Sequence, residues 1–295
     1  MNQRQFELPG PVKLGGTIGA AAIITTGTTA VRGNEAWKAT RTPDGPATVH
    51  IRVLGTSADA TAWGPGSDWI IEHAPDLCGA SDNAEDFVTD HPLIGRIQRQ
   101  HPADRIGRTH LVFEALIPSI LGQKVTGIES KRSLQAILRR HGEPAPGPHP
   151  LRVLPEPSVL AGLPSYEYHS LGVERRRAET IKRVAARARK LESAATMSPP
   201  DATRLLTAFR GVGVWTAALV TGAVHGDPDA VPVGDFHIPN TVSWALAGEP
   251  RGTDERMLEL LEPFAGHRGR VIRLLKSAGF SAPKYGPRQP IRSHF

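Results

Sequence analysis

Thiols are almost absent from this sequence, which has one cysteine, Cys78, among its 295 residues. One thiol cannot form a disulfide framework, and it cannot supply the several thiolates that hold an iron–sulfur cluster. The composition therefore excludes a disulfide-stapled secreted domain and an iron–sulfur cofactor. It favours a reducing compartment, so we expect a cytoplasmic protein.

Long apolar runs are scarce as well. The segment from Leu14 to Val31 contains no charged residue, but it has only 18 residues and is rich in glycine and threonine. A membrane-spanning helix needs about 20 mostly apolar residues, and the composition does not suit the apolar region of a signal peptide. We therefore expect no contact with a membrane, and we predict β-structure for this segment.

Metal-ligand patterns are missing too. The segment from Gly222 to Asp229 contains two aspartates and a histidine, but their spacing is not typical of a metal site. We therefore expect no catalytic metal.

Positive charge, in contrast, is abundant and unevenly distributed. The sequence has a net charge of +6 and a pI near 9.8. Residues 1–100 carry 8 Lys and Arg against 11 Asp and Glu, whereas residues 101–295 carry 27 against 18. A basic second part indicates a polyanionic partner, although charge that only keeps a surface soluble explains a modest excess as well.

The first 70 residues read as β-structure. Apolar and polar residues alternate from Thr48 to Leu54, and a Pro-Asp-Gly turn lies at Pro43 to Gly45. The stretches Ala22 to Thr26 and Trp37 to Thr40 also have strand-like composition. Together they predict a small antiparallel domain.

Helical patterns dominate the remainder. Residues 80–108 look like a connection, and the nearly wholly apolar run from Thr109 to Leu121 predicts a central helix. Amphipathic helices are predicted at Val125–His141 and at Glu174–Leu191, joined by an extended, proline-rich segment. We therefore predict an α+β fold with a β-rich N-terminal domain (1–104), a helical region (105–280) and a basic tail without stable structure (281–295).

A glycine turn joins two apolar helical segments within this helical region. Leu205 to Phe209 and Val214 to Val220 form helical faces, so Arg210-Gly211-Val212-Gly213 must reverse the chain in few residues. Glycine tolerates positive φ and allows a ligand to approach closely, and the free N–H groups of the second helix can bind a phosphate oxygen. The alternative is an ordinary turn between helices.

One carboxylate follows this turn. Asp235 lies in a segment framed by proline and glycine, just ahead of the apolar run that includes Val242 and Leu246. An aspartate in this position is either a helix N-cap or a catalytic group.

Together these residues resemble a known family. Leu-x-x-Phe-Arg-Gly-Val-Gly-Val-Trp-Thr-Ala is similar to the hairpin of the helix-hairpin-helix DNA glycosylases, which include endonuclease III and the alkylpurine glycosylases. The resemblance implies that Asp235 is catalytic and that Arg210, Gly211, Val212 and Gly213 contact double-stranded DNA containing a damaged base. Arg210 stands where the family has proline. The resemblance also implies a monomeric, nucleoid-associated enzyme, and relatives can hold a monovalent cation on hairpin carbonyls.

The central helix carries a second part of the resemblance. Phe113-Glu114-Ala115-Leu116 followed by Leu121-Gly122-Gln123 is similar to the alkylpurine glycosylases, in which the next residues fill the gap left by the flipped base. Here Lys124 replaces the apolar side chain of relatives, and it can pair with a phosphate. Gln123 and Lys124 are therefore candidate DNA contacts, with solvated loop residues as the alternative.

Trp215 bears on the reaction. Relatives with lyase activity carry a lysine at this position, so the resemblance implies a monofunctional enzyme. Trp215 is either a core residue or a wall of the base pocket; His237, Tyr168 and His169 are further pocket candidates. Because this stretch shows no second catalytic acid, we expect alkylated purines, which are already cationic. The alternative function is a non-catalytic DNA-binding relative in which Asp235 only caps a helix.

Overall fold

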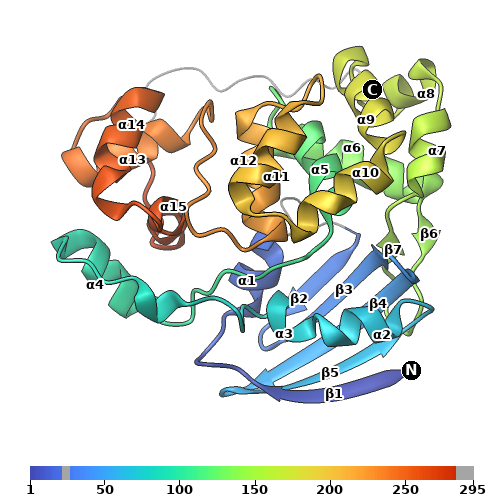
Figure 1. The fold of residues 1–295 in the computed structure, drawn as a ribbon, viewed down its shortest axis with the longest axis horizontal. Coiled ribbons are helices and arrows are strands. Elements are labelled where there is room, and N and C mark those ends of the chain that lie inside the picture. Colours follow the sequence, from blue (N-terminus) through green and yellow to red (C-terminus); the bar gives the residue numbers. More distant parts are fainter. Residues whose placement is uncertain (22–26, 284–295) are drawn as a thin grey trace.

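A five-stranded antiparallel sheet lies beside a larger group of helices (Figure 1). The computed structural model describes residues 1–21 and 27–283. The sheet has the order β1 (Asn2–Glu7), β5 (Ser57–Trp63), β4 (Gly45–Leu54), β3 (Glu35–Thr42) and β2 (Thr29–Arg32). The predicted antiparallel N-terminal part of an α+β fold is therefore confirmed.

Alternation along β4 explains which face of the sheet is buried. Val49, Ile51 and Val53 are buried, whereas the intervening His50 and Arg52 are partly or fully exposed. Helices α2 (Ser67–Glu72) and α3 (Ala74–Leu77) follow the last strand, and their Ile70 and Leu77 join the core formed by that buried face. The period of two thus directs one set of side chains to the core.

The prediction of β-structure from Leu14 to Val31 is wrong for its first part. Leu14–Ala21 forms a helix, α1, and among the described residues of this segment the strand begins at Thr29. Leu14 and Ile18 are one helical turn apart and both are buried against the sheet, so the apolar period here is that of a helix. The stretch from Ala22 to Thr26 lies outside the described residues.

Residues 80–108 are more than a connection. They contain the short 3-10 turn η1 (Ala84–Asp86) and helix α4 (Pro92–Gln100), which begins after His91 where Nδ1 accepts a hydrogen bond from the Ile94 N–H. Ile94 and Ile97 are fully buried against helices from the end of the chain. A segment from the first hundred residues therefore completes the C-terminal core.

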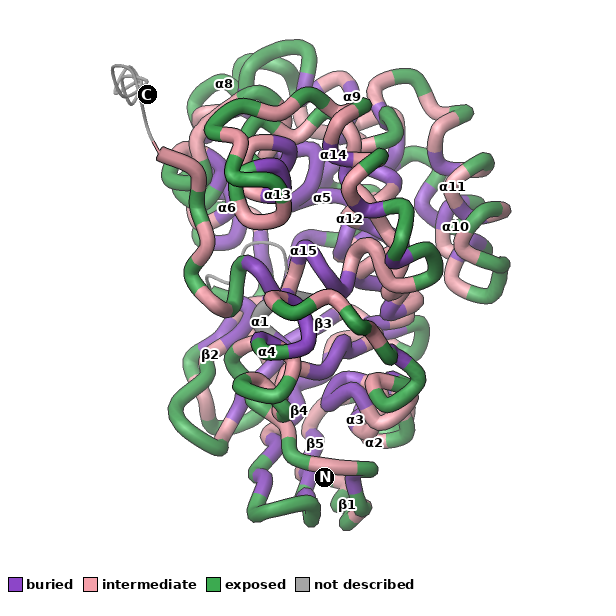
Figure 2. The backbone as a smooth tube through the Cα atoms, turned by 90° about the vertical axis from the view of Figure 1, so that its left-hand side faces the viewer, coloured by how far each residue is buried: buried purple, intermediate pink, exposed green. Residues whose placement is uncertain are grey.

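The helical region is built around α5 (Val112–Leu121). Every residue of this helix except Glu114 is buried, which confirms the predicted central helix, seen in the interior in Figure 2. The helices and short strands that follow are α6 (Gly127–His141), β6 (Glu143–Pro144), β7 (Arg152–Val153), α7 (Pro157–Gly162), α8 (Ser165–Ser170), α9 (Arg175–Ala185), α10 (Ala188–Glu192), η2 (Ser193–Thr196), α11 (Pro199–Thr207), α12 (Val214–Val224), α13 (Ile238–Ala247), α14 (Asp254–Leu261), η3 (Glu262–Phe264) and α15 (Arg268–Ser277).

The helix predicted from Glu174 to Leu191 is interrupted. The chain leaves helical geometry at Arg187, so α9 and α10 are separate helices. The proline-rich segment before them forms only the two-residue strands β6 and β7, where Val153 packs against Ala39 of the sheet.

Two helical cores result, and the chain crosses between them after α12. One core surrounds α5, α9 and α12, and the other joins α4 to α13, α14 and α15. The connecting segment carries the candidate carboxylate, Asp235, which therefore lies where the two cores meet. Within residues 1–21 and 27–283, no helix combines the length and apolar character that a bilayer crossing requires.

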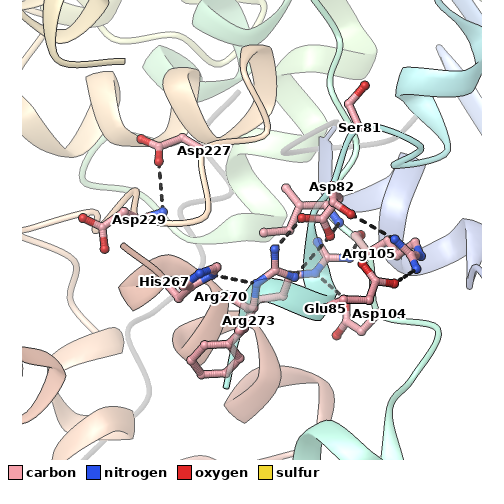
Figure 3. Close-up of polar contacts among 12 residues, drawn as sticks. Ser81, Asp82, Glu85, Asp104, Arg105, Asp227, Asp229, His267, Arg270 and Arg273 are labelled. Atoms are coloured by element: carbon pink, nitrogen blue, oxygen red, sulfur yellow. Dashed lines mark hydrogen bonds and ion pairs between the residues drawn. The ribbon is translucent and has the colours of Figure 1, made fainter. Parts of the chain in front are cut away.

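A network of ion pairs ties α15 to the segment that precedes the central helix (Figure 3). Arg270 Nη1 lies 3.1 Å from Asp82 Oδ2, both side chains are buried, and the same carboxylate oxygen accepts the Ile106 N–H at 2.8 Å. Arg273 pairs with Asp104 in the same way. Removing one partner of a buried pair costs about 3–5 kcal/mol, so this network fixes α15 firmly.

Candidate active site

The glycine turn between α11 and α12 is a close-packed hairpin. Gly211 has φ +97°, and a Cβ there would lie 2.3 Å from Thr180 Oγ1 of α9. Val212 is buried, and its N–H donates to Phe209 O at 2.9 Å. Gly213, in contrast, is exposed, and a Cβ there would meet no atom within 4 Å. The first glycine is therefore required by packing, and the second leaves the start of α12 open to a ligand.

Gln123 braces the hairpin from the neighbouring turn. Its Nε2 donates to Gly211 O at 3.0 Å and to Thr216 Oγ1 at 2.9 Å. Gln123 is therefore not a free loop residue, because its amide joins the end of α5 to both sides of the hairpin.

Lys124 follows at the tip of this turn. It is exposed and has φ +55°, a left-handed conformation that non-glycine residues rarely adopt. The side chain therefore points away from the core and lies beside the hairpin. Its contact with DNA stays a prediction.

Asp235 makes three hydrogen bonds with N–H donors. Oδ2 accepts from Trp215 Nε1 at 2.9 Å. Oδ1 accepts from the backbone N–H groups of His237 at 2.9 Å and Ile238 at 3.0 Å, at the start of α13. The carboxylate thus caps the start of α13 and also reaches Trp215 of the hairpin, and its catalytic role stays a prediction.

Trp215 links the three segments of the site. Its indole N–H binds Asp235, and its ring atom Cη2 would lie 3.5 Å from a Cβ on Gly122. The indole therefore spans from the turn after α5 to the carboxylate. A half-buried indole in this place provides an aromatic surface next to a negative charge, which suits a cationic, flat ligand.

Two predicted pocket residues do not join this arrangement. Tyr168 is fully buried in the helical core, its hydroxyl donates to Leu160 O at 2.6 Å, and burial raises the pKa of the phenol. The prediction of a pocket role for Tyr168 is therefore wrong, because its side chain is buried between α8 and the neighbouring helices of the core. His169 lies on the exposed side of α8, which packs against α9 (Figure 1).

His237 contributes its backbone to the site. Its N–H binds Asp235, whereas its exposed ring packs edge-on against Phe236 with ring centroids 4.9 Å apart. The side chain of Phe236 is 74% exposed, although it directly follows the candidate carboxylate.

Glu114, the acid on the central helix, contacts the sheet. Its Oε2 lies 3.4 Å from Lys38 Nζ of β3, and both side chains are nearly buried. Glu114 therefore joins the central helix to the sheet.

The acids between Gly222 and Asp229 are used within the loop and at α15. Asp227 Oδ1 accepts the Asp229 N–H at 2.9 Å, and burial raises the pKa of Asp227. Asp229 Oδ1 accepts from Arg268 N at 3.0 Å and Arg268 Nε at 2.8 Å (Figure 3 shows the position of Asp229). In the part of the chain that the structure describes, no group of three His, Cys, Asp or Glu side chains could hold a metal ion.

Two further residues contact or approach the site without any signal in the sequence. Asp254 of α14 binds the backbone of Gly234, the residue before the carboxylate. Lys276 of α15 lies close enough to Asp235 for the two charges to interact. Desolvation lowers the pKa of the Lys276 amine, although much of the residue is exposed, and the negative charge of Asp235 opposes that shift.

A hollow of about 660 Å³ between α7 and the start of α10 is a different feature. Its lining contains none of the residues of the candidate active site, so that site does not depend on it. Its lining consists of small apolar residues and cations: Pro157, Ser158, Ala161, Ala185, Ala186, Arg187, Ala188, Arg189 and Lys190.

Similarity to known proteins is visible in the fold. No family model matches the sequence, and no curated protein matches it. The 3-methyladenine DNA glycosylase of Archaeoglobus fulgidus superimposes with a TM-score of 0.76 at 18% identity, over 94% of this chain and 99% of that chain. An 8-oxoguanine glycosylase/lyase of Clostridium acetobutylicum gives a TM-score of 0.70 at 14% identity, over 94% and 96%.

A third structure matches a smaller share of this chain. The 3-methyladenine DNA glycosylase of Schizosaccharomyces pombe, solved with abasic DNA, gives a TM-score of 0.53 at 17% identity, over 65% of this chain and 93% of that chain. The chain therefore has the fold of the helix-hairpin-helix DNA glycosylases, and the resemblance that the hairpin carries in the sequence is confirmed at the level of the fold.

Proposed function

We propose that this protein is a monofunctional DNA glycosylase that excises N-alkylated purines from duplex DNA by hydrolysis. The observation that carries the proposal is the 2.9 Å hydrogen bond between Trp215 Nε1 and Asp235 Oδ2, which holds a carboxylate against an aromatic ring beside the hairpin. The fold supports it, because similar structures are described as DNA glycosylases, two of them for 3-methyladenine.

The carboxylate suits the bond that must break. Cleavage between the sugar C1′ and the base nitrogen builds positive charge on the sugar, and a fixed negative charge beside it stabilises the transition state by several kcal/mol. The three N–H donors on Asp235 fix its orientation before substrate arrives. The carboxylate oxygens are therefore already directed when the charge develops.

The base class follows from the leaving group. A purine alkylated at N3 or N7 carries positive charge, so it departs without protonation. Apart from Asp235, no acid side chain of the described residues is placed against Trp215 by a hydrogen bond. An indole face attracts a cationic base by about 0.5–2 kcal/mol, which favours an alkylated purine over a neutral one.

The DNA backbone has a proposed path along the hairpin and α9. Arg176 and Arg183 follow one side of α9 together with Thr180, which packs against Gly211, and Arg187 follows just after this helix ends. Arg183 Nη1 donates to Arg210 O at 2.6 Å, so this basic stripe reaches the hairpin. None of the three arginines forms an ion pair with a described residue, which leaves their charges available to phosphates.

The decisive test is base release from defined duplexes. Wild-type protein is incubated with duplexes containing N7-methylguanine, N3-methyladenine or 8-oxoguanine, and the freed base is measured. We expect release of the two alkylated purines and a loss of at least about 100-fold in rate for Asp235→Asn. The asparagine oxygen can still accept the two backbone bonds of α13, so folding should be retained. Equal rates for both proteins would remove Asp235 from catalysis.

Trapping with borohydride tests the monofunctional mechanism. An enzyme that uses an amine forms a Schiff base with the sugar, and borohydride converts it to a stable crosslink. We expect none, since Trp215 occupies the position of the lyase lysine. A crosslink that disappears in Lys276→Ala would assign lyase chemistry to that amine.

A second candidate function is a damage-binding protein without catalysis. The observation that favours it is the pair of backbone bonds by which Asp235 caps α13. Tight binding of damaged duplex without release of any base, together with a lower melting temperature for Asp235→Ala, would support this alternative.

A further inference from the structure

Asp254 is the first residue of α14, yet its carboxylate does not cap that helix. The cap is Thr253, whose Oγ1 accepts the Arg256 N–H at 3.2 Å. Both oxygens of Asp254 instead accept the Gly234 N–H, each at 3.0 Å, from a residue twenty positions earlier in the chain. The carboxylate is therefore directed at a different segment.

Gly234 is the bend that precedes Asp235. Its φ is +90°, it is exposed, and a Cβ there would meet no atom within 4 Å. The other hydrogen bonds of the backbone at this bend are local, from Val233 N to Val231 O at 2.9 Å and from Asp235 N to Pro232 O at 3.2 Å. Val231 and Val233, before the bend, pack against the C-terminal core, but Gly234 has no side chain to pack, so the bond to Asp254 connects its backbone to a helix outside the segment.

We propose that Asp254 is a positioning residue for Asp235. By holding the Gly234 N–H, the α14 carboxylate fixes the bend, and the bend sets the direction in which Asp235 Oδ2 meets Trp215. This proposal rests on the proposed function for its catalytic consequence, but the link between Asp254 and the Trp215 hydrogen bond exists without any substrate. A displacement of about 1 Å at a reacting group can cost about 100-fold in rate.

The chain offers a matched control. Glu255 is the next residue, carries the same charge in the same first turn of α14, and is exposed. Its pKa is lowered by a hydrogen bond with the side chain of Thr253, so its contact lies within its own helix. Glu255→Gln therefore removes one charge from the helix start and leaves Gly234 untouched.

The first measurement uses single-turnover base release at saturating enzyme, with duplex affinity and melting temperature measured in parallel. We expect Asp254→Ala to slow release about 10- to 100-fold with little change in affinity for DNA. Asp254→Asn, which keeps one acceptor oxygen, should recover part of the rate, and Glu255→Gln should match the wild type. An Asp254→Ala rate equal to wild type, or an equal loss in Glu255→Gln, would overturn the proposal.

The second measurement needs no activity. The indole N–H signal of Trp215 is identified in NMR spectra by its loss in Trp215→Phe. Asp235→Ala gives the chemical shift of that signal when the indole has no carboxylate acceptor. Asp254→Ala should move the signal toward that position, whereas Glu255→Gln should not. If wild-type protein releases no base but the signal moves, the positioning role stands and the proposed function fails. A signal that stays in place in a folded Asp254→Ala protein overturns the positioning role.

Discussion

The hairpin and the segment that carries Asp235 are held in place by different forces. The hairpin is held mainly by packing, because Gly211 lies against Thr180 and Val212 is buried, and two hydrogen bonds from Gln123 add to these contacts. In the carboxylate loop, residues 231–237, Val231 and Val233 pack against the C-terminal core, whereas Gly234 and Asp235 are held by hydrogen bonds with Asp254, with Trp215 and with the start of α13. The hairpin proposed to bind DNA is thus stabilised mainly by packing, and the carboxylate proposed for catalysis is held in a polar network of hydrogen bonds.

This difference has a practical meaning for mutagenesis. Packing defects cost several kcal/mol of unfolding free energy, whereas loss of one hydrogen bond to a charged group costs about 1.5–3 kcal/mol. Changes in the hairpin should therefore act through stability. Changes in the carboxylate loop should act on rate in a protein that remains folded.

The largest effect is expected where the hairpin packs most tightly. Gly211→Ala places a Cβ 2.3 Å from Thr180 Oγ1 at a φ of +97°, so we expect a loss of about 2–4 kcal/mol in the free energy of unfolding and much weaker DNA binding. Denaturant unfolding checks this value. Gly213→Ala is the control, because its Cβ meets nothing and its φ of −99° suits alanine; an equal loss in both variants would contradict the packing argument.

A smaller effect is expected from the bond that joins the two regions. Trp215→Phe keeps an aromatic ring and removes the Nε1–H donor to Asp235. We expect base release to slow about 10-fold, which corresponds to about 1.4 kcal/mol, with little change in melting temperature. Single-turnover kinetics measures the rate. If stability falls and the rate per folded molecule does not, Trp215 belongs with the packed hairpin instead of the polar network.

The smallest effect is expected at the edge of the hairpin. Arg183→Gln removes one cation of the basic stripe and should lower the slope of log affinity for duplex DNA against log salt by about 0.9. Arg4→Gln is the control, since Arg4 is exposed on β1, at the opposite end of the molecule from α9 in Figure 1. Fluorescence anisotropy across salt concentrations gives both slopes, and identical slopes for the two variants would place Arg183 outside the DNA path.

The sequence predicted the parts of the site that have local signals. Two glycines between helical faces marked the hairpin, and Asp235 followed it within a short, glycine- and proline-framed segment. The apolar run at α5 was equally clear, because nearly all of its residues are buried. Local pattern was sufficient for the hairpin turn and the central helix, because each lies within one stretch of chain.

The failures have physical reasons as well. The segment at Leu14 mixes glycine and threonine with apolar residues, so its helical period is masked by residues with low helix propensity. Tyr168 has the chemistry of a pocket residue, and only its burial identifies it as core. Asp254 looks like an ordinary acid at a helix start, and its bond to Gly234 depends on how α13 and α14 pack.

The dependence of the C-terminal core on α4 has a consequence for synthesis of the chain. Phe87, Ile94 and Ile97 are covered by side chains from residues 238–275. The chain is synthesised from its N-terminus at about 5–20 residues per second. These three apolar side chains therefore stay uncovered for on the order of ten seconds, until residues 238–275 have left the ribosome. A fragment that ends before α13 would leave these three side chains without the residues that cover them in the complete fold.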